Sequence, residues 1–90
     1  MAQKPRYTVE IKAQAAKEIR ALPTKRDRAL VMGRIAALAT DPLPPGCKKL
    51  VGYEAWRIRQ GRYRIVYTVD DGVVSVVVVR VGARKDVYRG

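Results

Sequence analysis

The sequence predicts an α+β fold in which an antiparallel helical hairpin packs on one face of a mainly antiparallel, four-stranded sheet. Three features of the chain support this prediction. An N-terminal segment alternates apolar and polar residues. Two segments with helical spacing of apolar residues follow, and the C-terminal third consists of apolar or alternating runs separated by glycine-containing turns. The expected order is β-α-α-β-β-β, and 90 residues leave room for only one hydrophobic core.

The first half of the chain is expected to form one strand and two helices. Tyr7–Ile11 alternates apolar and polar side chains, as a strand with one buried face does. Helical spacing begins at Ala13, and Pro23 ends it. Thr24 can cap a second helix, which Asp41-Pro42 terminates. The apolar stripes of the two helices are Ala15, Ile19 and Leu22, followed by Val31, Ile35 and Leu38.

The second half is expected to form a connecting loop and three strands. The segment DPLPPGCKKLVGYEA contains three prolines and two glycines, which disfavour regular structure. Strands are then expected at Ala55–Arg59, Arg62–Val69 and Val73–Val81. The last of these, VVSVVVVRV, is apolar on both faces, which favours a central position in the sheet.

The turn between the first two of these strands determines on which side of the sheet their arginines lie. Gln60-Gly61 fits a two-residue hairpin loop, which would place Arg59 opposite Arg62. In this register four arginines share one face: Arg57, Arg59, Arg62 and Arg64. The other face, toward the helices, would receive Trp56, Ile58, Tyr63 and Ile65. A slip by one residue would move arginines into the core, so the sequence specifies their side of the sheet well.

The turn around Asp70-Asp71-Gly72 determines whether a fifth arginine joins them. A three-residue loop with Gly72 in the left-handed conformation would place Arg80 opposite Arg62. A two-residue turn would point Arg80 toward the core, and the valine-rich strand is compatible with both. Five arginines without an intervening acidic residue favour an anion-binding surface, because guanidinium groups bind phosphate oxygens bidentately. The alternative is a sheet face kept soluble by long polar side chains.

The composition narrows the classes of partner and of chemistry. The net charge of +11 favours nucleic acid or an acidic protein as partner. The chain contains no histidine, which excludes histidine-based acid–base pairs, nucleophiles and metal sites. Its carboxylates are scattered, so neither a metal site nor a cofactor is expected. The single Cys47 and the absence of a long apolar run predict a cytoplasmic protein that does not enter a membrane.

Three segments together resemble the RelE toxins of bacterial type II toxin–antitoxin systems. They are YRIVYTVDDGVVSVVVVRVGARKDVYR, KKLVGYEAWRIRQGRYR and AAKEIRALP. The helical hairpin that contains the last of them also matches, so the resemblance extends over nearly the whole chain. The resemblance implies that residues 1–90 form a single RelE-like toxin domain. It also implies an endoribonuclease that enters the ribosomal A site, cuts the mRNA there without a metal ion, and so inhibits translation.

The resemblance also implies which residues carry out the cleavage. The family's working positions fall on Arg57, Arg59, Arg64, Arg84 and Tyr88. Arg64 would hold the scissile phosphate, while Arg57 and Arg59 position the RNA strand. Arg84 would stabilise the transition state, and Tyr88 would transfer the proton. Because some members carry lysine at the positions of Arg57 and Arg59, and arginine cannot readily act as a base, proton transfer would depend on Tyr88 here.

Further basic residues and a protein partner complete this interpretation. Arg62, Arg80, Lys48 and Lys49 are candidates for RNA binding, although the two lysines are equally compatible with a solvated surface. The resemblance implies a cognate, acidic, RelB-like antitoxin, and contact with operator DNA only through the toxin–antitoxin complex. Two alternatives stay open: a ParE-like inhibitor of DNA gyrase without hydrolytic activity, and a basic nucleic-acid-binding module without catalysis.

Overall fold

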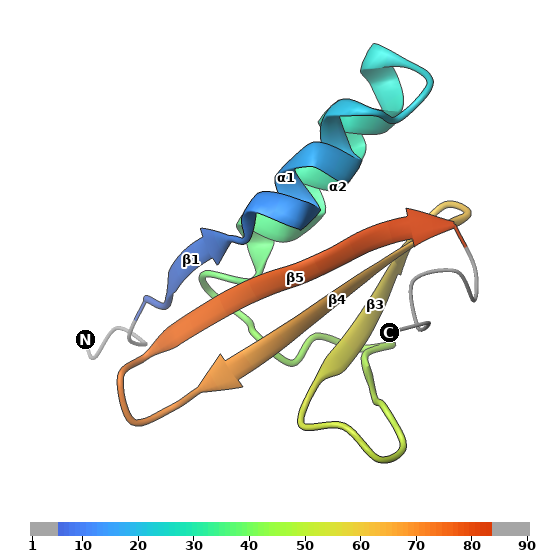
Figure 1. Ribbon diagram of the computed structural model, residues 1–90. Helices are drawn as coiled ribbons and strands as arrows, with labels where there is room; N and C mark the ends of the chain where they lie inside the picture. The colour runs from blue at the N-terminus through green and yellow to red at the C-terminus, as the bar shows by residue number, and fades with distance from the viewer. Residues whose placement is uncertain (1–5, 84–90) are drawn as a thin grey trace.

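Two helices pack on one five-stranded sheet in the computed structural model, which describes residues 6–83 (Figure 1). The strands follow the spatial order β1-β5-β4-β3-β2; β1 runs parallel to β5, and every other neighbouring pair is antiparallel. This arrangement confirms the predicted α+β class and the helical hairpin. The elements are β1 Thr8–Ile11, α1 Ala13–Arg20, α2 Lys25–Ala37, β2 Lys48–Lys49, β3 Trp56–Gln60, β4 Tyr63–Asp70 and β5 Ser75–Ala83.

The sheet has one strand more than the sequence predicts. Strand β2 lies in the segment that was expected to be a loop, and it pairs with β3 through Lys48 opposite Arg57 and Lys49 opposite Trp56. The Leu50 N–H donates to the carbonyl oxygen of Ala55 at 2.9 Å, which closes the connection between the two strands. Two residues are too few to show a periodicity, so this strand is specified by the partner strand rather than by its own sequence.

The helical hairpin is fixed by its capping groups. Thr24 caps α2 as predicted, because its Oγ1 accepts a hydrogen bond from the Asp27 N–H at 2.9 Å. Arg28 then donates to the carbonyl oxygen of Leu22 at 3.0 Å, which ties the second helix to the end of the first. Helix α1 lies over β5, and α2 lies over β3 and β4. No helix in residues 6–83 is long and apolar enough to cross a membrane.

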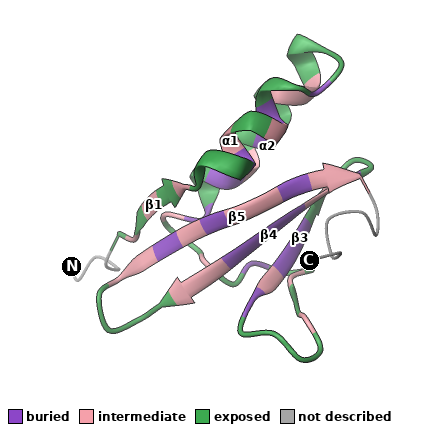
Figure 2. Cartoon of the chain, viewed as in Figure 1, coloured by how far each residue is buried: buried purple, intermediate pink, exposed green. Residues whose placement is uncertain are grey.

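The hydrophobic core lies between the helices and the sheet face that they cover, called here the inner face (Figure 2). The helical hairpin, with the residues that follow each helix, contributes all six residues of the two predicted stripes: Ala15, Ile19, Leu22, Val31, Ile35 and Leu38. The strands contribute Ile58, Tyr63, Ile65, Tyr67, Val76, Val78 and Val81. Trp56 is half-buried against this core. The predicted assignment of Trp56, Ile58, Tyr63 and Ile65 to the helix side is therefore confirmed.

Tyr67 anchors the proline-rich connection to the centre of the sheet. Its side chain is fully buried, and its hydroxyl donates a hydrogen bond to the carbonyl oxygen of Pro42 at 2.7 Å. Burial raises the pKa of Tyr67 above its usual value, and the neighbouring thiol of Cys47 raises this pKa further. The phenol therefore stays protonated and serves as a structural donor.

The turn between β3 and β4 lies one residue later than predicted, which shifts the pairing of the two strands by two residues. Gln60 lies opposite Tyr63, so the loop consists of Gly61 and Arg62 rather than of Gln60 and Gly61. Gly61 has a φ of 60°, which a two-residue hairpin loop requires at its first position and which favours glycine there. The predicted pairing of Arg59 with Arg62 is wrong. Because the shift is even, the faces assigned to the strand residues do not change.

The turn between β4 and β5 also differs from the prediction, and the difference moves Arg80. Asp70 lies opposite Ser75, so four residues form the loop, and the left-handed position is Val74 (φ 53°) rather than Gly72. The Asp70 carboxylate holds this loop by accepting the Gly72 N–H at 2.9 Å. A bulge then shifts the register, so that Arg80 lies opposite Val66 and not opposite Arg62 as predicted.

Candidate nucleic-acid interface

Basic side chains gather on the outer face of the sheet, which is the face turned away from the helices. Arg59 lies directly opposite Arg64, and Lys48 lies directly opposite Arg57. Arg62 adjoins them at the tip of the hairpin, where its guanidinium lies over the Tyr63 ring at 5.5 Å from the ring centre. These residues form the cationic patch: Lys48, Arg57, Arg59, Arg62 and Arg64.

The tip of the patch is hollowed. A shallow depression of about 270 Å³ is lined by Arg59, Gly61, Arg62 and Arg64. Three guanidinium-bearing residues thus border one open concavity, at a point where a glycine leaves the backbone uncovered. A phosphate group that enters this depression could accept hydrogen bonds from more than one arginine.

Arg57 occupies a different environment from the other members of the patch. Only 9% of its surface is exposed, and it is the one buried charged residue within residues 6–83. Its neighbour across the hairpin, Val66, belongs to a small apolar cluster on the outer face with Ala55, Leu50 and Val79. Sequence alternation places Arg57 on the outer face correctly but does not indicate this burial. Arg57 is therefore suited to positioning, whereas Arg59 is exposed to an incoming ligand.

Arg80 forms an ion pair with Glu18, a residue that the sequence does not mark as part of the site. Its Nε donates to Oε2 of Glu18 at 2.9 Å, and Oε1 of the same side chain accepts the Val81 N–H at 2.8 Å. Glu18 thus joins α1 to Arg80 and Val81, which follow the part of β5 that pairs with β1. The helical pattern alone could not reveal this contact, because it joins two segments that are 62 residues apart in the sequence.

The remaining predicted site residues are distributed as follows. Lys48 extends the cationic patch, while the adjacent Lys49 is within 3.5 Å of the exposed carboxylate of Glu54, an ion pair that contributes little. Arg84 and Tyr88 lie outside the described residues. Within residues 6–83, no group of three or more Cys, Asp or Glu side chains is placed to hold a metal ion.

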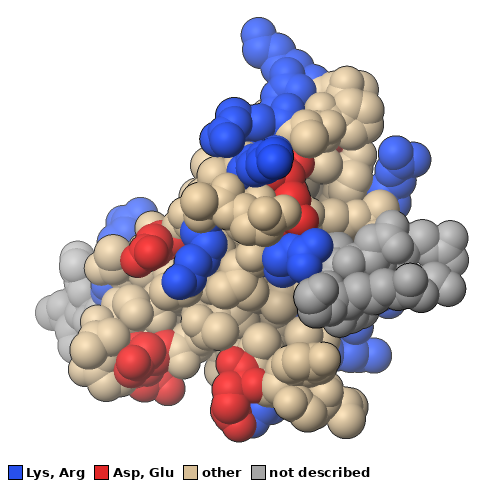
Figure 3. Space-filling model, in the orientation of Figure 1, with Lys and Arg blue, Asp and Glu red and all other residues tan. Residues whose placement is uncertain are grey.

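The helical hairpin carries a second group of basic residues, which Figure 3 shows over the upper part of the molecule. Its exposed members include Lys17, Arg20, Lys25 and Arg26. Acidic side chains form a few separate groups in the same view. Both the sheet and the helices can therefore attract a polyanion, but only on the sheet are arginines held opposite one another across a strand pair.

A helical hairpin over a sheet whose outer face carries a cationic patch defines a small, basic α+β protein. The family described as "ParE toxin of type II toxin-antitoxin system, parDE" matches residues 9–88. Toxin RelG of Mycobacterium tuberculosis is 34% identical over 86 residues, with 92% of this chain and 97% of the relative covered. Toxin RelE of the same organism is also 34% identical, with 92% and 87% covered.

Solved structures with a similar fold include toxins of the same kind. The crystal structure of the RelBE2 toxin–antitoxin complex from Mycobacterium tuberculosis contains a chain that superposes with a TM-score of 0.76 at 29% identity, covering 93% of this chain and 98% of that chain. The chain therefore belongs to the RelE/ParE superfamily of type II toxin–antitoxin toxins.

Proposed function

We propose that this toxin is a ribosome-dependent endoribonuclease that cuts mRNA in the ribosomal A site and so inhibits translation in the cytoplasm. The observation that carries the proposal is the pairing of Arg59 with Arg64 beside an open, arginine-lined depression. A phosphate group that enters this depression can accept hydrogen bonds from more than one guanidinium group, which suits the binding of an RNA backbone. The similarity to proteins named RelE and RelG supports the same activity.

The main requirement of the proposed reaction is the stabilisation of negative charge in the transition state, and no cofactor takes part in it. The 2′-hydroxyl of one nucleotide attacks the adjacent phosphorus, the P–O2′ bond forms, and the P–O5′ bond breaks. The products are a 2′,3′-cyclic phosphate and a free 5′-hydroxyl. Negative charge grows on the phosphoryl oxygens in the transition state, and preorganised guanidinium groups stabilise it where it develops.

Each of the five residues predicted to be catalytic has a role in this scheme. Arg64 holds the scissile phosphate, while Arg59 and the buried Arg57 fix the RNA strand beside it. Tyr88 accepts the proton of the 2′-hydroxyl. Arg84 stabilises the transition state and the charge on the leaving 5′-oxygen, which takes up a proton from water. A phenol ionises near pH 10 in water, and cationic neighbours favour the phenolate that this role requires.

We further propose that a cognate, acidic, RelB-like antitoxin neutralises this protein. The net charge of +11 favours an acidic partner, and the RelBE2 toxin crystallised together with its antitoxin. A partly disordered acidic chain that folds on the toxin would cover the cationic charge and bury additional surface. Contact with operator DNA would then occur through the complex rather than through the toxin alone.

Inhibition of DNA gyrase is the second candidate function, and the family match favours it, because the matching family is that of ParE toxins. A gyrase inhibitor performs no hydrolysis, so it would not require Arg84 or Tyr88. The two candidates therefore differ in their target and in which residues they need.

The test is a cleavage assay with purified toxin, programmed ribosomes and a defined mRNA, in which primer extension maps the 5′ ends. Wild type, Arg84→Ala and Tyr88→Phe run side by side, with Arg20→Ala on α1 as a matched basic control and naked mRNA as substrate control. Cuts in the A-site codon that require ribosomes, disappear in both site variants and persist in Arg20→Ala are expected. If wild type is toxic in cells but cuts nothing, the nuclease proposal fails, and inhibition of gyrase supercoiling becomes the next measurement.

A further inference from the structure

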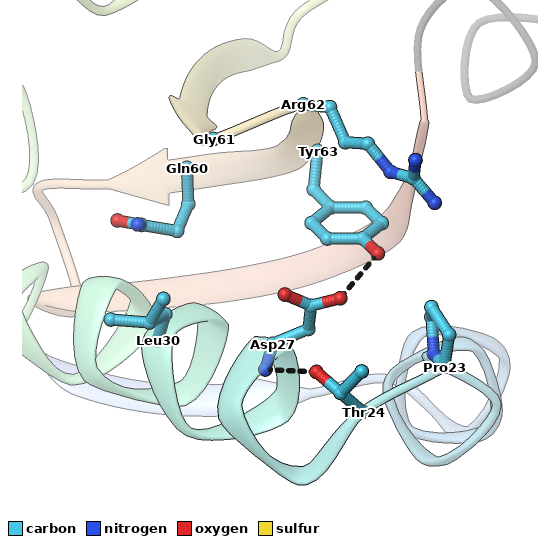
Figure 4. Close-up of a pocket in the computed structure, with 8 residues that line it drawn as sticks. All are labelled: Pro23, Thr24, Asp27, Leu30, Gln60, Gly61, Arg62 and Tyr63. Carbon is cyan, nitrogen blue, oxygen red and sulfur yellow. Dashed lines mark hydrogen bonds between the residues drawn. The ribbon is translucent and has the colours of Figure 1, made fainter.

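A second concavity adjoins the cationic patch on the other side of the β3–β4 turn. It has a volume of about 430 Å³ and lies between the start of α2 and the tip of the hairpin (Figure 4). Its lining includes Asp27 and Leu30 from α2, and Gln60, Gly61, Arg62 and Tyr63 from the hairpin. Gly61 and Arg62 also line the arginine-bordered depression, so the two concavities meet at this turn.

The walls of this pocket are chemically different from those of the depression. Leu30, which is 43% exposed, supplies an apolar wall from α2, and Gln60 supplies an amide from β3. Asp27 supplies a carboxylate, one oxygen of which accepts the Tyr63 hydroxyl at 2.8 Å. Figure 4 shows the other carboxylate oxygen turned toward the space between Gln60 and Leu30. A single negative group thus faces an open pocket in a protein of net charge +11.

We propose that this pocket binds an unpaired nucleobase, with guanine preferred, of an RNA strand whose phosphate occupies the depression beside it. The inference rests on the proposed nuclease function and deepens it by adding a base-reading site. Unpaired bases are recognised through their Watson–Crick edges and by stacking on aromatic, guanidinium or apolar groups. A volume of about 430 Å³ accommodates a purine and part of its ribose.

The preference for guanine follows from the carboxylate of Asp27. Guanine is the one common base that presents two adjacent donors, N1–H and the 2-amino group, to a single carboxylate. Adenine and cytosine present one amino group next to a ring nitrogen with a lone pair, which the carboxylate repels. Uracil presents one N–H between two carbonyl oxygens. The oxygen that accepts the Tyr63 hydroxyl keeps a second lone pair, so Asp27 can accept both guanine donors.

Binding of non-cleavable oligonucleotides tests this inference. Fluorescein-labelled 2′-O-methyl pentanucleotides UUUUU, UUGUU, UUAUU and UUCUU lack the attacking hydroxyl, and fluorescence anisotropy gives their affinities. We expect wild type to bind UUGUU about tenfold more tightly than UUUUU, the discrimination typical of a bidentate contact to a base. In Asp27→Asn the preference should fall below about twofold, while the affinity for UUUUU stays equal or rises because a negative charge is lost.

Two further variants test whether a loss of guanine preference comes from the pocket itself, from the change of net charge or from unfolding. Asp41→Asn makes the same change of charge at an exposed position after α2 and should keep the guanine preference. Leu30→Lys adds an ammonium group beside Asp27 at an exposed position, so it should abolish the preference while the protein stays folded by thermal unfolding. Equal affinity of wild type for all four oligonucleotides, or an unchanged preference in Asp27→Asn, would overturn the inference. The ribosome cleavage assay gives its result independently, so failure of the base site and failure of the nuclease proposal can be distinguished.

Discussion

On the inner face of the β3–β4 hairpin, Ile58 lies opposite Ile65 and both side chains are fully buried, whereas on the outer face of the same strands Arg59 lies opposite Arg64. The isoleucine pair stabilises the fold by removing hydrocarbon from water. The arginine pair places two like charges on neighbouring strands of the same hairpin. The inner pair thus contributes to stability, whereas we propose that the outer pair contributes to RNA binding. Substitutions on the two faces should therefore have opposite consequences.

The largest effect is expected on the inner face. Ile65→Ala removes buried methyl groups from a position with no exposed surface, and the helices above it cannot close the resulting cavity completely. We expect a loss of about 3 kcal/mol in the free energy of unfolding, measured by urea denaturation. An antitoxin-free domain of this size should then be substantially unfolded at 37 °C. A loss below about 1 kcal/mol would mean that the inner face does not carry the stability assigned to it.

Tyr67→Phe is expected to have the next largest effect, because it removes the hydroxyl bond of a fully buried side chain on the same face. The carbonyl oxygen of Pro42 would lose its donor, at a cost of about 1 to 2 kcal/mol in the free energy of unfolding. Tyr63→Phe is a matched control that removes an equally part-buried hydroxyl bond, to Asp27. The Tyr63 side chain is less completely buried than that of Tyr67, so the loss should be smaller. Equal losses in the two variants would contradict the stronger role of Tyr67.

The stabilising contribution of Tyr67 should also depend on pH. Burial raises the pKa of Tyr67 in the folded state above the value of about 10 in the unfolded chain. The contribution is therefore fully present below about pH 10, and it is lost as the pH rises above this value, because the unfolded chain loses the proton first. The stability difference between wild type and Tyr67→Phe should shrink from pH 7 to about pH 11 in urea titrations. A difference that grows over this range would contradict the assignment.

On the outer face, Arg59→Gln should weaken RNA binding without weakening the fold. Loss of one phosphate contact is expected to reduce the affinity for the oligonucleotide UUUUU about five- to tenfold, and to lower the slope of log affinity against log salt by about 1. Arg20→Gln on α1 makes the same change of charge outside the cationic patch and should have a smaller effect. If both variants bind equally well, net charge rather than the patch controls RNA binding.

The same comparison shows which parts of the structure the sequence could predict. The inner face was predicted almost completely, since Ala15, Ile19 and Ile35 follow a helical period and the β3 and β4 residues alternate. The side of the sheet on which Arg59 and Arg64 lie was also predicted, because alternation fixes it. These features depend on spacing within one segment.

Features that depend on contacts between distant segments were not predicted. Three features require a partner strand or helix that local spacing does not specify. They are the exact register of the β3–β4 pairing, strand β2, and the contact of Arg80 with Glu18. The burial of Arg57 likewise depends on neighbours from other segments of the chain. The pocket around Asp27 could not be predicted for the same reason, because it forms only where the start of α2 lies next to the tip of the hairpin.

The smallest expected effect gives the most direct test of the contrast between the faces. If Arg59 and Arg64 repel each other across the hairpin, Arg59→Gln should raise the free energy of unfolding by about 0.2 to 0.5 kcal/mol at low salt. The gain should disappear at about 1 M salt, where the screening length is about 3 Å. Urea titrations of wild type and variant at both salt concentrations would measure it, with Arg20→Gln as the control. A loss of stability at low salt would show that Arg59 supports the fold, and the outer face would then need no ligand to explain its charge.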